Sequence, residues 1–161
     1  MGGLGSGRHW LYKRNTVEEC LTLDINKLVK DGLLHRLFGE VRWCRGGEEN
    51  AYVNYWLKRD PVYVLTLCPF LIRRDERIPL TQDIPLVTME LHSGGKRYWF
   101  TCPNCGRRVG KLHLPHGAER FLCRNCYDLT YKSCQECHKF DRLLAGMGIH
   151  PSVGKRLFRR N

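Results

Sequence analysis

The sequence has no long hydrophobic run. No apolar stretch approaches the roughly 20 residues that a transmembrane helix needs. The first ten residues, MGGLGSGRHW, lack the apolar centre of a signal peptide. The chain also lacks a basic amphipathic helix of the kind that binds anionic membranes. We therefore expect a cytoplasmic protein that has no membrane partner and stays in a reducing compartment.

Most catalytic fingerprints are also missing. The chain shows no P-loop, no dinucleotide-binding glycine pattern and no recognisable Ser–His–Asp set. His113 and His116, between two cysteine pairs, point to one enzyme class, a nuclease of the His–metal finger type. Leu112 stands where that class has an acidic residue, and the interval between the cysteine pairs is too short. We predict that the protein is not an enzyme and keep this nuclease as a minor alternative.

Acidic residues are few for the number of basic ones. The 161 residues include 27 Lys and Arg but 16 Asp and Glu, which gives a net charge of +11. Such a chain is attracted to polyanions, and nucleic acid is the default partner. Hydrophobic residues make up 42% of the chain, so we expect one compact domain, or a small domain with a metal-stapled module attached.

Cysteine is abundant, at nine residues. In a reducing compartment, cysteines act as metal ligands or free thiols and not as disulfides. Two CxxC pairs, Cys102 with Cys105 and Cys123 with Cys126, are separated by a gap that fits a hairpin. Four thiolates in this spacing predict one tetrahedral, structural Zn²⁺ with no open coordination position. An iron–sulfur cluster or a rubredoxin-type iron is the alternative.

The remaining cysteines are interpreted separately. A third CxxC pair with a neighbouring histidine could hold a second zinc ion, through Cys134, Cys137 and His138. The gap before this pair is too short for another ribbon hairpin, so unliganded thiols are the competing interpretation. Three further cysteines stand in apolar patterns and are interpreted as small core residues, namely Cys20, Cys44 and Cys68.

Two short helical segments are predicted in the first part of the chain. Thr16 and Glu19 have capping-box spacing, which predicts a short helical turn. A second short helix is predicted over Ile25–Lys30, capped by Asp24 and ended by Gly32. A helix-turn-helix is not expected, because no second, longer helix follows.

The middle of the chain has the composition of β-strands. We predict strands over residues 40–43, 51–58, 62–72, 86–91 and 97–101. The short turns between them favour an antiparallel meander. In the second strand, aromatic or apolar residues occupy both alternating sets. Its Tyr52 and Trp56 could stack nucleobases, but without an aromatic–Gly–aromatic signature we expect such residues to fill a small β-sandwich core.

The predicted fold class is α+β, mainly β. Short N-terminal helices and the meander are followed by a zinc ribbon whose hairpin strands are residues 107–114 and 120–122. The expected organisation is a flexible basic arm at 1–15, a helix-plus-sheet domain at 16–97, the ribbon at 98–135 and a basic C-terminal helix or tail at 136–161.

Basic residues cluster around the cysteine pairs and in the terminal segments. Between Lys96 and Arg124 the only acid is Glu119. Because Lys and Arg side chains bind successive phosphates, we predict a nucleic-acid interface. Its predicted residues are Arg8, Lys13, Arg14, Lys96, Arg97, Arg107, Arg108, Lys111, Arg120, Arg124, Lys155, Arg156, Arg159 and Arg160.

Three stretches of the chain carry a resemblance, namely MGGLGSGR, LDINKLVKDGLL and FLCRNCYDLTYKS. They resemble a widespread family of small, mostly uncharacterised bacterial zinc-ribbon proteins, often encoded near phages and mobile elements. The resemblance implies that the four cysteines of the first two pairs bind metal and that residues 2–8 are the family's glycine-rich start. The chain departs from the family pattern at Cys134 and Cys137 and in a shorter, more broken tail. The resemblance implies a mobile-element setting but no activity.

Two functions follow as expectations. The first is a nucleic-acid-binding accessory protein that grips the phosphate backbone of DNA or RNA with its ribbon and basic arms. The alternative is a protein-docking adaptor or inhibitor that acts on a host or phage machine, such as a polymerase or a defence complex. Zinc ribbons serve both purposes, and the charge favours the first.

Overall fold

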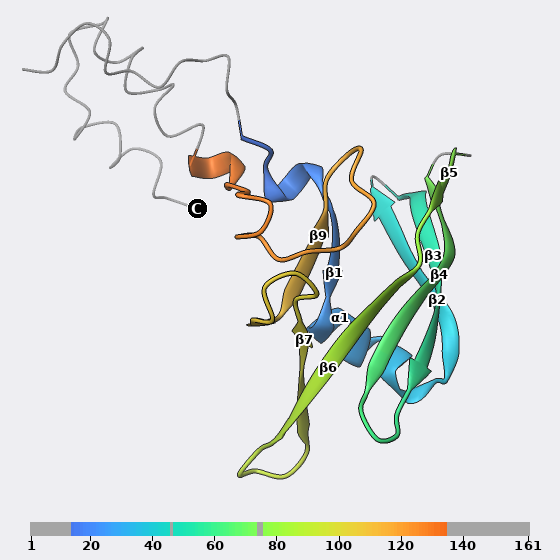
Figure 1. Ribbon diagram of the computed structural model, residues 1–161, viewed down its shortest axis with the longest axis vertical. Helices are drawn as coiled ribbons and strands as arrows, with labels where there is room; N and C mark the ends of the chain where they lie inside the picture. Colours follow the sequence, from blue (N-terminus) through green and yellow to red (C-terminus); the bar gives the residue numbers. More distant parts are fainter. Residues whose placement is uncertain (1–13, 46, 74–75, 135–161) are drawn as a thin grey trace, which may run out of the picture.

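A computed structural model of the chain describes residues 14–45, 47–73 and 76–134. The fold is mainly β, an antiparallel sheet curled into a half-barrel with a few short helices and a four-cysteine cluster (Figure 1). The predicted arm up to residue 13 and the predicted C-terminal helix or tail from residue 136 lie outside the described residues. Among the described residues, no helix is long and apolar enough to cross a membrane.

The large sheet has seven strands. They are β2 (Phe38–Arg45), β3 (Glu48–Lys58), β4 (Val64–Arg73), β5 (Glu76–Pro79), β6 (Gln82–Glu90), β7 (Lys96–Thr101) and β8 (Arg108–Val109). Their order is β2-β3-β4-β6-β7-β8, with β5 paired only to β4. All pairs are antiparallel, as the short turns predict. Each predicted strand is present with shifted ends, whereas β5 was not predicted.

A second, two-stranded sheet joins distant parts of the chain. It pairs β1 (Leu21–Asp24) with β9 (Lys111–Leu114). The prediction of one hairpin strand over residues 107–114 is therefore wrong. Gly110 divides that segment between the two sheets, and its carbonyl accepts a 3.0 Å hydrogen bond from the Ile25 N–H. The second predicted hairpin strand is reduced to a bridge between His113 and Leu122.

Three short helical segments flank β1. They are η1 (Val17–Glu19), α1 (Ile25–Lys30) and η2 (Leu33–His35). The Asp24 side chain accepts from the Asn26 N–H at 2.9 Å and so caps α1. Gly32 follows α1 in a left-handed backbone conformation (φ 69°), which residues with a Cβ rarely adopt.

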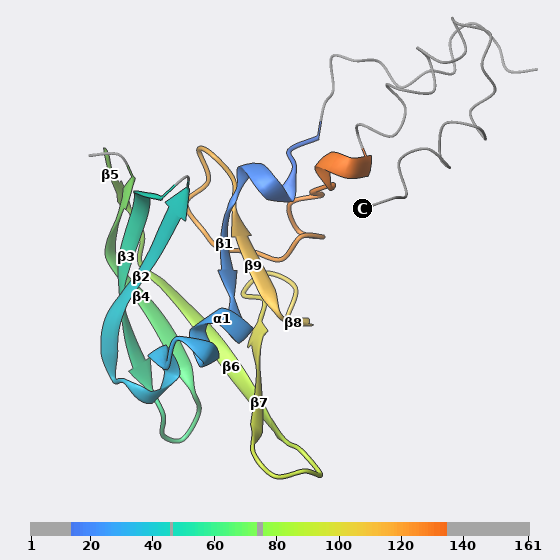
Figure 2. The same cartoon turned by 180° about the vertical axis from the view of Figure 1, so that it is seen from behind.

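One continuous core connects the sheets and the cysteine cluster. Its largest fully buried side chains include Tyr55, Phe100 and Phe121. Trp43 of β2 stacks on Phe121 at 5.9 Å and donates from its indole nitrogen to the Thr22 carbonyl of β1 at 2.8 Å. The β1–β9 pair therefore bridges the two ends of the curled sheet, as the view from behind shows (Figure 2).

The two faces of β3 differ sharply. Val53, Tyr55 and Leu57 are buried, which follows from their alternation in the sequence. Trp56 is 60% exposed and contacts Phe38, which is also exposed, across the strand pair, with ring centroids 5.9 Å apart. The prediction that the aromatic residues on both faces fill a core is therefore wrong for Trp56. Its face of the sheet has no covering layer among the described residues.

The predicted core role of the isolated cysteines also needs correction. Cys44 is exposed, because it follows the inward-facing Trp43 on β2 and so lies on the outer face of the sheet. Cys20 and Cys68 are half-buried. Cys68 follows the fully buried Leu67 on β4, so it lies on the opposite, outer face of the sheet.

Candidate metal centre

The first cysteine pair forms a tight turn directly after β7. The Cys102 N–H donates to the Arg107 carbonyl and the Gly106 N–H donates to the Cys102 carbonyl, both at 2.9 Å. Gly106 adopts a positive φ of 68°, which other residues adopt only with strain. The turn returns the chain into β8, and Cys102 and Cys105 are thereby placed on the same side of it.

The second pair is held by contacts on both sides. Leu122, immediately before Cys123, exchanges two backbone hydrogen bonds with His113 of β9 at 2.8 and 3.1 Å. The buried Gln82 side chain accepts from the Phe121 N–H at 2.7 Å and donates to the Phe121 carbonyl at 2.9 Å. The Cys126 N–H then donates to the Cys123 carbonyl at 3.0 Å and closes the turn.

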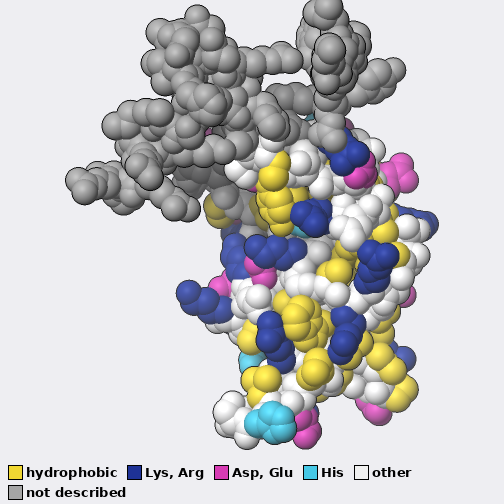
Figure 3. Space-filling view, turned by 90° about the vertical axis from the view of Figure 1, so that its left-hand side faces the viewer, with side chains coloured by type: hydrophobic (Ala, Val, Ile, Leu, Met, Phe, Trp, Pro, Cys, Tyr) yellow, Lys and Arg dark blue, Asp and Glu magenta, His cyan; other side chains and the backbone are white. Residues whose placement is uncertain are grey.

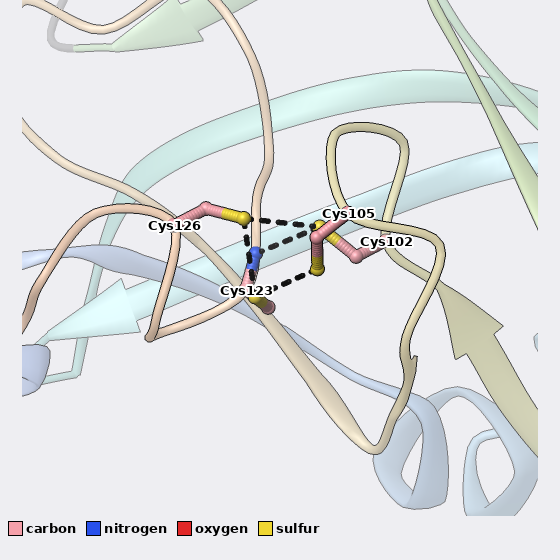
Figure 4. A group of neighbouring side chains, drawn as sticks. All are labelled: Cys102, Cys105, Cys123 and Cys126. Atoms are coloured by element: carbon pink, nitrogen blue, oxygen red, sulfur yellow. Dashed lines mark hydrogen bonds between the residues drawn. The ribbon is translucent and has the colours of Figure 1, made fainter.

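The four sulfur atoms converge on one point (Figure 4). The Sγ–Sγ distance is 3.8 Å between Cys102 and Cys126 and 3.7 Å between Cys105 and Cys123. It is 3.5 Å between Cys123 and Cys126. All four sulfurs lie within 4.8 Å of one another. The two predicted CxxC pairs therefore form a single cluster.

This cluster fits one metal ion. A tetrahedral zinc site with bonds of about 2.3 Å has neighbouring sulfurs about 3.8 Å apart, which matches the observed spacing. A cluster of several irons places inorganic sulfides between its ligands, so its thiolates must stand further apart. Four soft thiolate ligands in tetrahedral arrangement are typical of Zn²⁺. Four protein ligands leave no coordination position for water or substrate.

Hydrogen bonds to sulfur orient two of the ligands. The Asn104 side-chain amide donates to Cys126 Sγ at 3.3 Å. The Cys123 N–H donates to Cys102 Sγ at 3.4 Å. Such donors stabilise thiolates and fix their direction towards a metal.

The cysteines differ in how easily they ionise. Burial raises the pKa of Cys102, but backbone N–H groups of Cys105, Cys123 and Asn104 outweigh it and lower that pKa to about 6. Burial raises the pKa of Cys123 to about 12, and the thiol groups around it add to the effect. For Cys126, the Asn104 amide and the Cys123 thiol lower the pKa, while burial and the thiols of Cys105 and Cys102 raise it more. A bound cation therefore favours ionisation of Cys123 and Cys126, the two thiols whose pKa values are raised.

None of the other predicted site residues that the structure describes belongs to this cluster. Cys134 is exposed, and its predicted companions Cys137 and His138 lie outside the described residues. His113 is buried, and its Nδ1 lies 3.0 Å from the Thr22 hydroxyl, whereas His116 is exposed. Within the described part of the chain, the four cysteines are the only group of metal-ligating side chains.

All the predicted nucleic-acid-binding residues that the structure describes are exposed, namely Arg14, Lys96, Arg97, Arg107, Arg108, Lys111, Arg120 and Arg124. The others lie outside the described residues, namely Arg8, Lys13, Lys155, Arg156, Arg159 and Arg160. Two of the exposed cations form ion pairs. Arg14 pairs with Asp128 at 3.0 Å, and Lys111 pairs with Asp24 at 3.1 Å.

Two arginines lie on one face of the sheet against uncharged groups. Arg97 lies over the Trp99 ring, 4.5 Å from its centroid, and Arg108 donates to Met89 Sδ at 3.3 Å. Strand register places all four side chains on the outer face of β6, β7 and β8. We call these four residues the arginine face. Figure 3 views the side of the molecule that carries β7 and β8, where Lys and Arg side chains surround hydrophobic ones and outnumber acids.

Three residues of this region were missed by the interpretation of the sequence. Asn104 had a signal, because it stands inside the first CxxC pair next to a ligand. Trp99 and Tyr131 had none, since an aromatic residue in a strand or loop is usually part of a core. Tyr131 is 43% exposed, and the Arg124 guanidinium lies 5.2 Å from its ring centroid.

Comparisons with known proteins give no further guide. No model of a known protein family, no curated protein and no solved structure matches the chain. The resemblance of three stretches to a bacterial family, with its mobile-element setting, therefore stays a prediction. Function has to be argued from the metal centre and the charged side chains around it.

Proposed function

We propose that this protein binds nucleic acid, with one structural zinc ion in the four-cysteine centre and the arginine face against the phosphate backbone. The observation that carries the proposal is that the two arginines of the arginine face contact uncharged groups. Arg97 and Arg108 contact an indole ring and a thioether, and neither forms an ion pair among the described residues. Their positive charge is not neutralised, and a stacked guanidinium keeps donors free for phosphate.

The metal centre supports this face mechanically. Cys102 follows β7, which carries Arg97, and the turn through Cys105 leads into β8, which carries Arg108. A metal held by both cysteine pairs fixes the angle between these two strands. Structural zinc contributes about 10 kcal/mol or more of apparent binding free energy at neutral pH, enough to order a segment of this size. The zinc would hold structure and take no part in chemistry.

The first test is a salt titration of zinc-loaded protein against single-stranded DNA, duplex DNA, duplex RNA and structured RNA. Binding that survives near physiological salt and prefers one class supports the proposal. A net charge of +11 gives any polyanion some affinity at low salt, so affinity at low salt alone decides nothing. If all four classes lose binding together below physiological salt, the charge is generic and the proposal fails.

A pair of double variants locates the interface. Arg97→Gln with Arg108→Gln should lower the slope of log affinity against log salt by about 1.5, since each lost phosphate contact removes roughly 0.7 to 0.9. Lys58→Gln with Arg77→Gln removes the same charge from exposed positions on β3 and β5 and should leave most of the slope in place. Equal losses in the two double variants would mean that the arginine face has no special role.

Docking to another protein is the second candidate function. One observation favours it, the exposed pair of Phe38 and Trp56, which are 68% and 60% exposed on the outer face of β2 and β3. Large exposed apolar side chains that touch one another are common at protein interfaces. A docking protein would show weak nucleic-acid binding without class preference and a tight protein partner that is lost in Trp56→Ala.

A further inference from the structure

A pocket of about 300 Å³ opens beside the second cysteine pair. Its lining includes Arg14, Arg124, Asn125, Asp128 and Tyr131. Nothing in the metal centre itself requires these side chains, because the four sulfurs are already close enough to share one ion. The volume is at the lower end of the range for small-ligand sites, and it suits one small planar group with an attached anion.

The backbone of the pocket is fixed by the metal centre and by the start of the described chain. Arg124 and Asn125 stand between Cys123 and Cys126, so metal binding sets their position. The Leu129 N–H donates to the Arg124 carbonyl at 3.0 Å. The Thr130 backbone exchanges hydrogen bonds with residues 15 and 17 at 3.2 and 2.9 Å. Such a frame fixes the backbone from which these side chains project, which lowers the cost of ordering the site around a ligand.

The side chains of the pocket match the parts of a nucleotide. Arg124 and Arg14 are cations suited to phosphate. Tyr131 is half-exposed, with Arg124 close to its ring, so a base can stack on the tyrosine or on the guanidinium plane. The Asn125 amide offers both a donor and an acceptor to a base edge. A pocket that combines two arginines, an aromatic ring and an amide offers stacking and hydrogen bonding to a base in addition to charge attraction to phosphate.

We infer that this pocket binds one unpaired nucleotide, so that single-stranded nucleic acid, DNA or RNA, is the preferred ligand. The inference rests on the proposed nucleic-acid function and narrows it. A base in a duplex is stacked and paired, and it cannot enter a pocket of this size unless it leaves the helix. The arginine face can contact the backbone of either form, but the pocket discriminates between them.

The test compares fluorescence anisotropy of labelled oligothymidine, oligouridine and a duplex of equal length, near physiological salt. Tyr131→Ala should weaken binding of the single strands roughly 5- to 150-fold, the range for loss of one stacked base, and leave the duplex nearly unchanged. Tyr131→Phe should bind as the parent protein does. Trp56→Ala removes an exposed aromatic side chain from β3, outside the pocket, and serves as the matched control. Zinc content and melting temperature confirm that each variant is folded.

A substitution with the opposite effect sharpens the test. The Asp128 carboxylate is 70% exposed and pairs with Arg14, so it repels an incoming phosphate while it holds the arginine. Asp128 has a positive φ of 48°, a conformation that asparagine also tolerates. Asp128→Asn should therefore keep the fold, remove the repulsion and tighten binding of single strands more than of duplex. Mononucleotides, tested as competitors, distinguish a free nucleotide from a strand as the ligand.

The outcomes separate the two proposals. If single strands bind more tightly than duplex and Tyr131→Ala removes that difference, the inference holds. If nucleic acid binds near physiological salt but Tyr131→Ala affects single strands and duplex equally, or neither, the pocket inference is overturned and the proposed function survives. If no nucleic acid binds at that salt concentration, the proposed function fails and the pocket inference fails with it.

Discussion

Gln82 is the side chain that ties the second cysteine pair to the large sheet. It is 7% exposed at the start of β6, and its amide makes two hydrogen bonds to the backbone of Phe121, two residues before Cys123. Gln82→Met keeps the length and approximate volume of the side chain and removes both bonds. The buried N–H and carbonyl of Phe121 are then left without partners.

The expected loss follows from these two groups. Each unsatisfied buried polar group costs about 1 to 3 kcal/mol. Methionine offsets part of that loss, because a buried amide is replaced by an apolar group. We expect the free energy of unfolding to fall by about 2–3 kcal/mol.

Urea denaturation of the zinc-loaded protein measures this loss, with an unchanged slope against denaturant as the sign of two-state behaviour. Thr66→Val is the matched control, because it deletes an exposed side-chain hydrogen bond to Asp83 at 2.6 Å on the neighbouring strand. That control should stay within about 0.5 kcal/mol of the parent protein. A loss of less than about 0.5 kcal/mol in Gln82→Met would refute the claim that Gln82 clamps the segment.

Zinc binding near pH 7 should release the protons of both Cys123 and Cys126, because the pKa values of these thiols are raised. The zinc affinity should therefore rise with pH. A zinc titration in weakly buffered solution counts the released protons, and release of fewer than two would contradict the assignment. Asn104→Ala removes the hydrogen-bond donor to Cys126 Sγ and should weaken zinc affinity about 10-fold or more, as measured by competition with a chelator. An unchanged zinc affinity would show that the amide has no role. Gly39→Ala would place a Cβ 2.7 Å from the buried Tyr55 hydroxyl and should lower the free energy of unfolding, measured by urea denaturation, by about 1–3 kcal/mol. An unchanged free energy of unfolding would mean that the tyrosine ring moves freely.

The strands of the large sheet could be predicted because their patterns are local. In β3, the alternation of Val53, Tyr55 and Leu57 with the other residues of the strand corresponds directly to its buried face and its more exposed face. The exposure of Trp56 could not be predicted in the same way. Alternation shows that a residue lies on the second face, but only the whole fold shows whether another layer covers it.

The small sheet escaped prediction for a different reason. Its two strands have four residues each, and Leu21 pairs with Leu114 across most of the described chain. A four-residue segment next to helix-capping signals carries too little pattern to identify it as a strand. The same long-range pairing explains why the segment around Gly110 divides between two sheets, which no local spacing indicates.

The metal centre was the most predictable part of the site. Two CxxC pairs at hairpin spacing determine which four sulfurs meet, since each turn places its own two thiolates together. The surroundings were less predictable. The positions of the basic residues were visible in the sequence, but the contact of Arg108 with Met89 depends on the register of β6, β7 and β8. The pocket around Tyr131 likewise requires distant segments to meet.

X-ray absorption at the zinc edge, combined with metal analysis, tests the closed four-thiolate centre most directly. The four-cysteine cluster predicts one zinc ion bound there, with four sulfur neighbours at about 2.3 Å and no nitrogen or oxygen neighbour. Cys105→Ala should lose this signature, whereas Cys44→Ala, which alters an exposed cysteine outside the cluster, should keep it. A nitrogen or oxygen ligand in the parent protein, or iron in place of zinc, would contradict the assignment of a structural zinc held by these four cysteines.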